Sequence, residues 1–341
     1  MVNWFRNYIR NKNKYKLHIM KKLVLTILLL SVIKMTNAQS LLKVNCKKNK
    51  TTKTMCTNNS NIENHRKNQK TFNSSDGIIK YIDQGKGDVL LLLHGVPTSS
   101  WLYRKMIDDL VAKGFRVIAP DMLGFGNSDN PEGYEIYSSK EHAKRLIELM
   151  DSLGIQSWNH LMHDAGGLWT WELIKNNPNR VSKLIILNTL ILEDGFYPPM
   201  KMKEGRTAKF ILSLYRKKLT SNILLRLLFK GGLVNNYLTK NEFEGYQKSL
   251  LEGKTNAMYY FFTQLSKPFP NYEETLKQLT IPVAIIWGKA DKILRWEPQM
   301  KKVSELLKIE DHNIHIIEGS HFIQEEQPDK ITAIINDFIN E

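Results

Sequence analysis

From residue 76 onward, short apolar runs alternate with amphipathic stretches, and this alternation limits the folds open to the chain. Short apolar runs are typical of strands buried in a sheet, whereas the stretches between them repeat apolar residues at helical spacing. The strand candidates are Ile78–Ile82, Val89–His94, Arg116–Pro120, Asn159–His163, Lys183–Leu187, Val283–Trp287 and Asn313–Ile317. The helix candidates are Trp101–Ala112, Ser139–Leu153, Leu168–Asn176, Pro298–Leu307 and Lys330–Ile339. This order predicts an α/β fold with a mainly parallel sheet flanked by helices.

The alternation is interrupted once, between residues 190 and 278, where the periodicity is helical throughout. Segments such as FILSLYRKKL (210–219) and ILLRLLF (223–229) contain no strand-like run. We therefore expect a helical cap inserted into an α/β core made of residues 76–189 and 279–341. Ligands of such sheets bind at the carboxyl ends of the strands, so the cap is expected to cover a site there.

The charge of the chain is concentrated at its N-terminus. Residues 1–75 contain 16 Lys and Arg and one acidic residue, whereas residues 76–341 contain 33 basic and 33 acidic residues. The part expected to fold is therefore neutral as a whole. Composition thus argues against a nucleic-acid partner and indicates no protein partner.

Residues 1–38 have the pattern of an export signal. Lys21 and Lys22 precede an apolar run over residues 23–33, and Ala38 ends a small-residue cleavage site. Cleavage after Ala38 predicts a periplasmic or secreted protein. Without cleavage, the same segment predicts a membrane-anchored one.

Residues 39–75 are rich in Lys, Asn and Thr and poor in apolar residues, which predicts a disordered basic tether. The only cysteines, Cys46 and Cys56, lie in this segment. In an oxidising compartment they are candidates for a disulfide, and the alternative is two free thiols.

The segment LMHDAGGLW (161–169) places a carboxylate where a predicted strand turns into a predicted helix. Asp164 ends the strand, and Gly166 and Gly167 open the helix. A sharp strand-to-helix turn with small residues beyond it holds the intervening side chain in a strained, accessible position that suits a nucleophile. Taken alone, Asp164 also fits an ordinary helix N-cap.

Two further polar side chains follow predicted strands. Asp291 lies in GKADKIL (288–294) and His321 in GSHF (319–322), each just beyond a strand candidate. Taken alone, Asp291 also fits an ordinary turn residue, and His321 also fits a helix cap. Because the carboxyl ends of parallel strands meet at one edge of a sheet, we expect them to lie near Asp164. A nucleophile, a base and an acid that orients the base form a catalytic triad for two-step hydrolysis.

Five segments together resemble the haloalkane dehalogenase and epoxide hydrolase branch of the α/β-hydrolase fold. They are HGVPTSSWLYRKM (94–106), APDMLGFGNSD (119–129), HDAGG (163–167), GKADKIL (288–294) and GSHFIQE (319–325). The resemblance covers residues 78–341 and is weak over the expected cap.

The resemblance implies a role for each candidate residue. Asp164 is the nucleophile, which is already ionised at neutral pH and forms an alkyl ester with the substrate. His321 is the base that activates water against this ester, and Asp291 orients it. The backbone N–H groups of Val96 and Ala165 form the oxyanion hole. Such a reaction uses a small-molecule substrate and water, with no cofactor or metal.

The leaving group is open at this point. Haloalkane dehalogenases usually hold the halide with a tryptophan after the nucleophile and a second one in the cap. This chain has Ala165 and no tryptophan in residues 190–278. Three tryptophans outside the cap could take over the halide contact, but each is better explained by helix packing: Trp101, Trp169 and Trp171. Epoxide hydrolases instead use cap tyrosines, and the candidates are Tyr197, Tyr215, Tyr237, Tyr246, Tyr259, Tyr260 and Tyr272.

Overall sequence similarity favours a haloalkane dehalogenase-like hydrolase acting on a small apolar substrate. The first alternative is an epoxide hydrolase, which Val96 in HGVP suits better than it suits a dehalogenase. The second is a non-catalytic binding protein that keeps the hydrolase fold. The three differ in what the pocket beside Asp164 must contain: two indole or amide donors for a halide, two cap tyrosine hydroxyls for an epoxide, or side chains that plug it.

Overall fold

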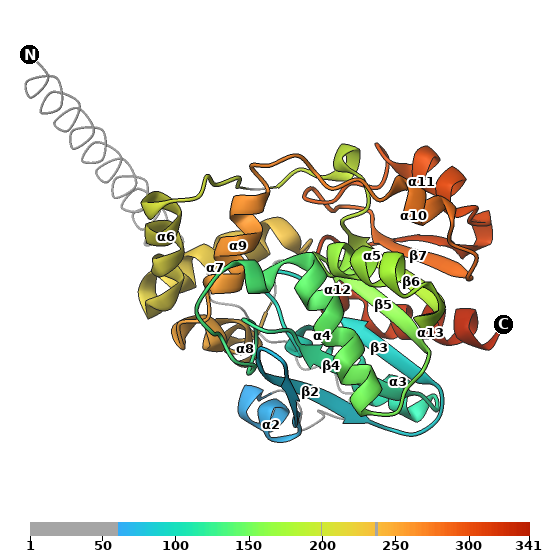
Figure 1. Ribbon diagram of the computed structural model, residues 1–341, viewed down its shortest axis with the longest axis horizontal. Coiled ribbons are helices and arrows are strands. Elements are labelled where there is room, and N and C mark those ends of the chain that lie inside the picture. Colours follow the sequence, from blue (N-terminus) through green and yellow to red (C-terminus); the bar gives the residue numbers. More distant parts are fainter. Residues whose placement is uncertain (1–60, 199, 236–237) are drawn as a thin grey trace, which may run out of the picture. The chain divides into compact units, whose positions relative to one another are not determined.

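The computed structural model describes residues 61–198, 200–235 and 238–341 of the chain. Within these residues lies an eight-stranded sheet of order β1-β2-β4-β3-β5-β6-β7-β8 (Figure 1). Its strands are β1 (Lys70–Ser74), β2 (Gly77–Gln84), β3 (Val89–Leu93), β4 (Arg116–Asp121), β5 (Trp158–Asp164), β6 (Val181–Thr189), β7 (Val283–Gly288) and β8 (Ile314–Ile317). Strands β3 to β8 run parallel to one another, while β2 pairs antiparallel with both of its neighbours, β1 and β4. This confirms the predicted mainly parallel α/β fold.

Helices pack on the sheet in pairs. Helix α4 (Ser139–Ser152) contacts α5 (Gly166–Asn176), and α3 (Ile107–Ala112) contacts α13 (Pro328–Asn340). In Figure 1, α4 and α5 lie in front of the strands and α13 lies behind them. Strand β5 is buried along its whole length, as expected for a central strand covered on both faces. Two shorter helices, α11 (Met300–Leu307) and α12 (Ile323–Glu326), flank β8 in the chain.

Residues 61–75 belong to this fold, so the prediction of a disordered tether is wrong for them. They form α2 (Ile62–Lys67) and β1. The ring of His65 in α2 is buried against Trp101, with the ring centroids 5.3 Å apart, and its Nε2 lies 2.8 Å from Ser100 Oγ. Strand pairing and a buried histidine hold the segment, and neither produces the apolar periodicity that marks a helix. The export signal, residues 39–60 and both cysteines lie outside the described residues.

Between β6 and β7, residues 190–282 form what we call the helical insertion. It contains α6 (Arg206–Ser213), α7 (Lys218–Gly232), α8 (Lys240–Leu251), α9 (Asn256–Gln264) and α10 (Glu273–Lys277), and its described residues contain no strand. Helix α8 fixes it to the core. A Cβ on Gly245 would lie 2.2 Å from the Trp101 ring, so only glycine allows this close approach.

A buried ion-pair network strengthens the same junction. Arg104 of the core contacts Glu325 at 2.5 Å and Glu242 of α8 at 3.0 Å. Trp101 Nε1 also donates to the backbone carbonyl of Glu242 at 3.1 Å. The insertion is thereby joined to the segment that follows His321. In the part of the chain described here, no helix is both long and apolar enough to span a membrane.

Candidate active site

Asp164 occupies a strained turn between β5 and α5, as its sequence context predicts. Its φ is +51°, in the left-handed region that non-glycine residues rarely adopt. The glycines around it allow unusually close packing. A Cβ on Gly166 would lie 2.8 Å from the His94 carbonyl oxygen, and one on Gly95 would lie 2.4 Å from the Asp164 side chain. The turn therefore fixes the carboxylate at the carboxyl end of β5.

The Asp164 carboxylate is buried and doubly held. Its Oδ2 accepts a hydrogen bond from the Val96 backbone N–H at 2.8 Å, and its Oδ1 lies 3.5 Å from His321 Nε2. Burial raises the pKa of this carboxyl, but the hydrogen bond and charge of His321, together with the hydrogen bond from the Val96 N–H, outweigh that effect and lower its pKa. Asp164 is therefore an anion at neutral pH.

His321 lies between two carboxylates. Its Nδ1 is 2.9 Å from Asp291 Oδ2, and its Nε2 faces Asp164. Burial alone would lower the pKa of His321, but Asp291 and Asp164 together raise that pKa to about 10. The ring is thus an imidazolium while both neighbours are charged. Neutralising Asp164 would remove one of the two charges that hold this proton.

Asp291 is held by a residue that sequence reasoning missed. Asn188 Nδ2 donates to Asp291 Oδ2 at 2.7 Å, and the Gly288 N–H donates to Asn188 Oδ1 at 2.8 Å. The other Asp291 oxygen accepts from the N–H groups of Ile293 and Leu294 at 2.8 and 2.9 Å. Asn188 precedes the last residue of β6, a position at the same sheet edge that could have identified it.

Two further histidines support the surrounding loops. His163 Nε2 donates to the His321 backbone carbonyl at 2.9 Å, although sequence reasoning gave His163 no role. Burial and the neighbouring His321 charge lower the pKa of His163 to about 4, so its ring is neutral. His94 Nδ1 donates to the Gly95 carbonyl at 2.7 Å, and His94 Nε2 accepts from the Met122 N–H at 3.0 Å. Both His94 nitrogens are therefore engaged in shaping the turn before Val96.

Asp164 and His321 open onto an apolar pocket of about 320 Å³. Its other lining residues are Val96, Pro97, Phe196, Pro198, Met200, Tyr215, Leu224, Leu227, Leu228, Met258, Phe261, Phe262, Leu265 and Ile293. Among the described residues of this lining, Tyr215 supplies the one hydroxyl, where two are expected for an epoxide hydrolase. Burial raises the pKa of this phenol to about 12. Among the described residues that line this pocket there is no indole and no side-chain amide.

The other candidate tyrosines are engaged elsewhere. The Tyr246 hydroxyl donates to Glu325, the Tyr272 hydroxyl donates to Glu172 at 2.9 Å, and the Tyr259 hydroxyl accepts from the Gly205 N–H at 2.9 Å. Tyr197 is largely exposed, Tyr260 lines a second pocket, and Tyr237 lies outside the described residues.

The candidate tryptophans do not line the pocket beside Asp164 either. The Trp101 indole N–H donates to the Glu242 carbonyl at 3.1 Å, and that of Trp171 donates to the Leu190 carbonyl at 2.8 Å. Trp169 lines the second pocket. The indole N–H groups of Trp101 and Trp171 are therefore already used by backbone carbonyls.

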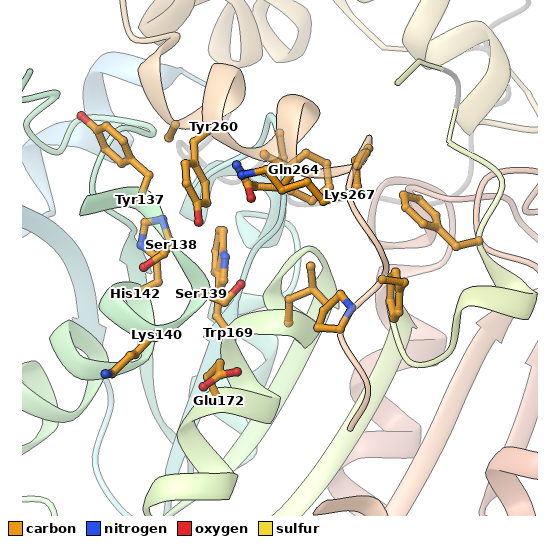
Figure 2. A pocket seen from close by; sticks show the side chains of 18 of the residues that line it. Tyr137, Ser138, Ser139, Lys140, His142, Trp169, Glu172, Tyr260, Gln264 and Lys267 are labelled. Carbon is orange, nitrogen blue, oxygen red and sulfur yellow. The ribbon is translucent and has the colours of Figure 1, made fainter. Parts of the chain in front are cut away.

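The second pocket, of about 350 Å³, adjoins the first (Figure 2). The two share four lining residues, Val96, Phe196, Phe261 and Leu265. Figure 2 shows side chains of α9 and the loop after it, including Tyr260 and Gln264, facing side chains of α4 and α5. This space has a more polar lining than the pocket beside Asp164. In the described part of the chain, no group of three or more His, Cys, Asp or Glu side chains is arranged to hold a metal ion.

Comparisons with known proteins agree with this architecture. The family model for the alpha/beta hydrolase fold matches residues 88–328. Haloalkane dehalogenase 2 of Mycobacterium tuberculosis is 30% identical over 277 residues, which cover 77% of this chain and 92% of that protein. Epoxide hydrolase 4 of Mus musculus is 26% identical, over 76% of this chain and 74% of that protein.

Among solved structures, haloalkane dehalogenase DbeA from Bradyrhizobium elkani has the same fold. It aligns with a TM-score of 0.61 and 20% identity, covering 80% of this chain and 97% of that one. The family match spans β5, which ends at Asp164, and the segments after β7 and β8 that carry Asp291 and His321. The chain therefore belongs to the alpha/beta hydrolase fold family and is a hydrolase.

Proposed function

We propose that this hydrolase opens small, largely apolar epoxides through an alkyl-enzyme ester on Asp164, and that the helical insertion acts as its cap. The observation that carries the proposal is the pocket in which Asp164, His321 and the Tyr215 hydroxyl are the polar groups among apolar side chains. Such a lining excludes water from the reacting carbon and selects apolar substrates.

In the first step, a carboxylate oxygen of Asp164 forms a bond to a ring carbon of the epoxide as the C–O bond of the ring breaks. The departing oxygen takes the electron pair and needs a proton, because an alkoxide is a poor leaving group. Tyr215 supplies this proton from its O–H. A bromide or chloride needs no proton but needs N–H donors around it, and the described pocket lining offers neither an indole nor an amide.

In the second step, His321 acts as the base. Esterification removes the negative charge of Asp164, so the pKa of His321 falls. The ring then releases its proton, which replaces the one that Tyr215 donated in the first step, and the neutral ring accepts a proton from water. The resulting hydroxide attacks the ester carbonyl carbon of Asp164. The Val96 N–H, already 2.8 Å from Asp164 Oδ2, and the Ala165 N–H stabilise the oxyanion. Release of the diol restores the carboxylate.

The test is direct turnover by the wild-type chain. Terminal epoxides and 1-bromoalkanes of equal chain length are offered, and diol formation and bromide release are measured. Diol formation with little bromide release supports the proposal. Bromide release as the main activity would instead favour the haloalkane dehalogenase that the sequence similarity suggests. No turnover of either class, or of esters, would favour the non-catalytic alternative, against which the open pocket argues.

Tyr215→Phe is expected to slow epoxide opening by about 100-fold or more, because the substitution removes the proton donor and little else. The measurement is the single-turnover rate of ester formation with a terminal epoxide. Tyr260→Phe, in the second pocket, is the matched control and is expected to retain most of the rate. Equal rates for Tyr215→Phe and the wild type would assign the proton to another donor.

Asn188→Ala is expected to lower the turnover number by about tenfold and the free energy of unfolding by about 1–3 kcal/mol. The substitution leaves the buried Gly288 N–H without its partner and removes one of the two hydrogen bonds to Asp291 Oδ2, the other being that from His321. Steady-state kinetics and denaturant unfolding check the two effects, with the exposed Asn179→Ala as the control. A loss of stability with unchanged turnover would limit Asn188 to a structural role.

A further inference from the structure

The neutral charge of the folded part conceals a strong separation of charge. Residues 196–234, which include α6 and α7, contain nine Lys and Arg and one acidic residue. The rest of residues 76–341 contains 24 basic and 32 acidic residues. We call residues 196–234 the basic segment. Its one acid, Glu204, pairs at 3.2 Å with Lys267, which lies outside the segment.

The charges of the basic segment face solvent together with apolar side chains. All nine basic residues are exposed: Lys201, Lys203, Arg206, Lys209, Arg216, Lys217, Lys218, Arg226 and Lys230. Eight large apolar side chains are exposed in the described residues, and five of them lie in this segment. They are Tyr197, Phe210, Leu219, Leu227 and Val234. Such a concentration is unusual, because exposed apolar side chains are normally scattered.

Helix α7 shows how the two kinds of side chain share one surface. Leu219, Arg226 and Lys230 lie about two and three helical turns apart and therefore project from the same face. Leu219 is 72% exposed, the most exposed of the large apolar side chains described. Leu225 and Phe229 project from another side of the helix and are buried. In Figure 1, α6 and α7 lie at the end of the fold opposite α13, away from the strands.

We propose that the basic segment binds the surface of an anionic phospholipid bilayer. Lys and Arg interspersed with exposed Leu and Phe are typical of protein surfaces that bind at a lipid interface. There the Lys and Arg side chains contact phosphate headgroups, and the apolar side chains enter the boundary of the acyl chains. The phosphates of a nucleic acid would pair with the Lys and Arg side chains, but a nucleic acid offers no comparable site for Leu219 or Phe210. A second copy of this surface would face it with nine like charges.

The basic segment also adjoins the pocket beside Asp164. Leu227 is half exposed and also lines the pocket beside Asp164, as do Leu224 and Leu228 of the same helix. A bilayer against α7 would therefore adjoin the pocket wall. An apolar substrate would then pass from lipid to the pocket over a short path along α7.

Site-specific fluorescence tests the proposal in the full-length chain. Cys46→Ser and Cys56→Ser remove the native thiols, and Leu219→Cys carries a nitrobenzoxadiazole label. A label at Met300→Cys, which replaces an exposed apolar residue outside the basic segment, is the control. With vesicles of phosphatidylcholine containing about 30% phosphatidylglycerol, we expect the label at position 219 to brighten and to be quenched by spin-labelled lipid. The label at position 300 is expected to change little, even if the N-terminal residues bind lipid themselves.

Charge reversal gives a second, independent measurement. Lys217→Glu, Lys218→Glu and Lys230→Glu together are expected to weaken vesicle binding, read by the label at 219, by at least about tenfold. Neutral phosphatidylcholine vesicles are expected to bind weakly. Equal signals at 219 and 300, unchanged binding after charge reversal, or binding of duplex DNA without a lipid signal would each overturn the proposal. No substrate is used, so a failure of the proposed hydrolysis leaves this result unaffected.

Discussion

Asp164→Ala is expected to lower turnover by at least about 10⁴-fold, to the level of the uncatalysed reaction. The substitution removes the one carboxylate that lies beside both the pocket and His321. No other aspartate or glutamate is among the described residues that line this pocket. Without the carboxylate no ester forms, and the second step has nothing to hydrolyse.

The measurement is steady-state diol formation from a terminal epoxide at saturating substrate. Asp329→Ala, which removes an exposed carboxylate at the start of α13, is the control and is expected to keep wild-type turnover. Alanine adopts a φ of +51° no more readily than aspartate does, so denaturant unfolding is measured alongside to show that the variant is folded. Residual turnover well above background in a folded Asp164→Ala variant would place the nucleophile elsewhere.

The edge of the sheet could be predicted because strand ends are visible in the sequence. Each of Asp164, Asp291 and His321 follows an apolar run, and parallel strands bring their carboxyl ends to one edge. The observed separations of 2.9 Å and 3.5 Å between His321 and the two carboxylates agree with that expectation. The catalytic roles of these residues remain predictions.

Contacts between distant segments could not be predicted in the same way. Asn188 directly follows the strand candidate Lys183–Leu187, which indicates the sheet edge, but only the folded structure shows that it joins Asp291 to β7. Tyr215 is one of seven tyrosines in the insertion, and its selection depends on how the helices pack around the pocket. Periodicity reports which side of an element is buried, but it does not report what lies against that side.

The helix predicted after β3 is wrong for a different reason. The sequence predicts one helix over Trp101–Ala112, whereas the structure has a short 3₁₀ turn, Ser100–Tyr103, followed by α3. The Ser99 side chain accepts from the Trp101 N–H and ends the preceding loop there. Tyr103 then donates its hydroxyl to the Leu93 carbonyl at 2.8 Å, a tertiary contact that competes with continuous helix.

His321→Gln is expected to stop the reaction after its first step and to accumulate the ester on Asp164. Glutamine cannot take the proton from water, whereas the first step uses the Asp164 carboxylate and the Tyr215 proton and does not need His321 as a base. Steady-state turnover is expected to fall by about 10³-fold or more, while one equivalent of substrate is consumed rapidly. Intact-protein mass spectrometry followed by peptide mapping measures the adduct and its position.

The adduct mass distinguishes the two leaving groups. Epoxide opening adds the whole mass of the epoxide, because its oxygen stays with the alkyl group. A bromoalkane adds its mass less that of hydrogen bromide, because the halide departs. His312→Gln, which changes an exposed histidine, is the control and is expected to turn over without a stable adduct. An adduct mapped to another residue, or full turnover by His321→Gln, would contradict both the role of His321 and the two-step mechanism that depends on it.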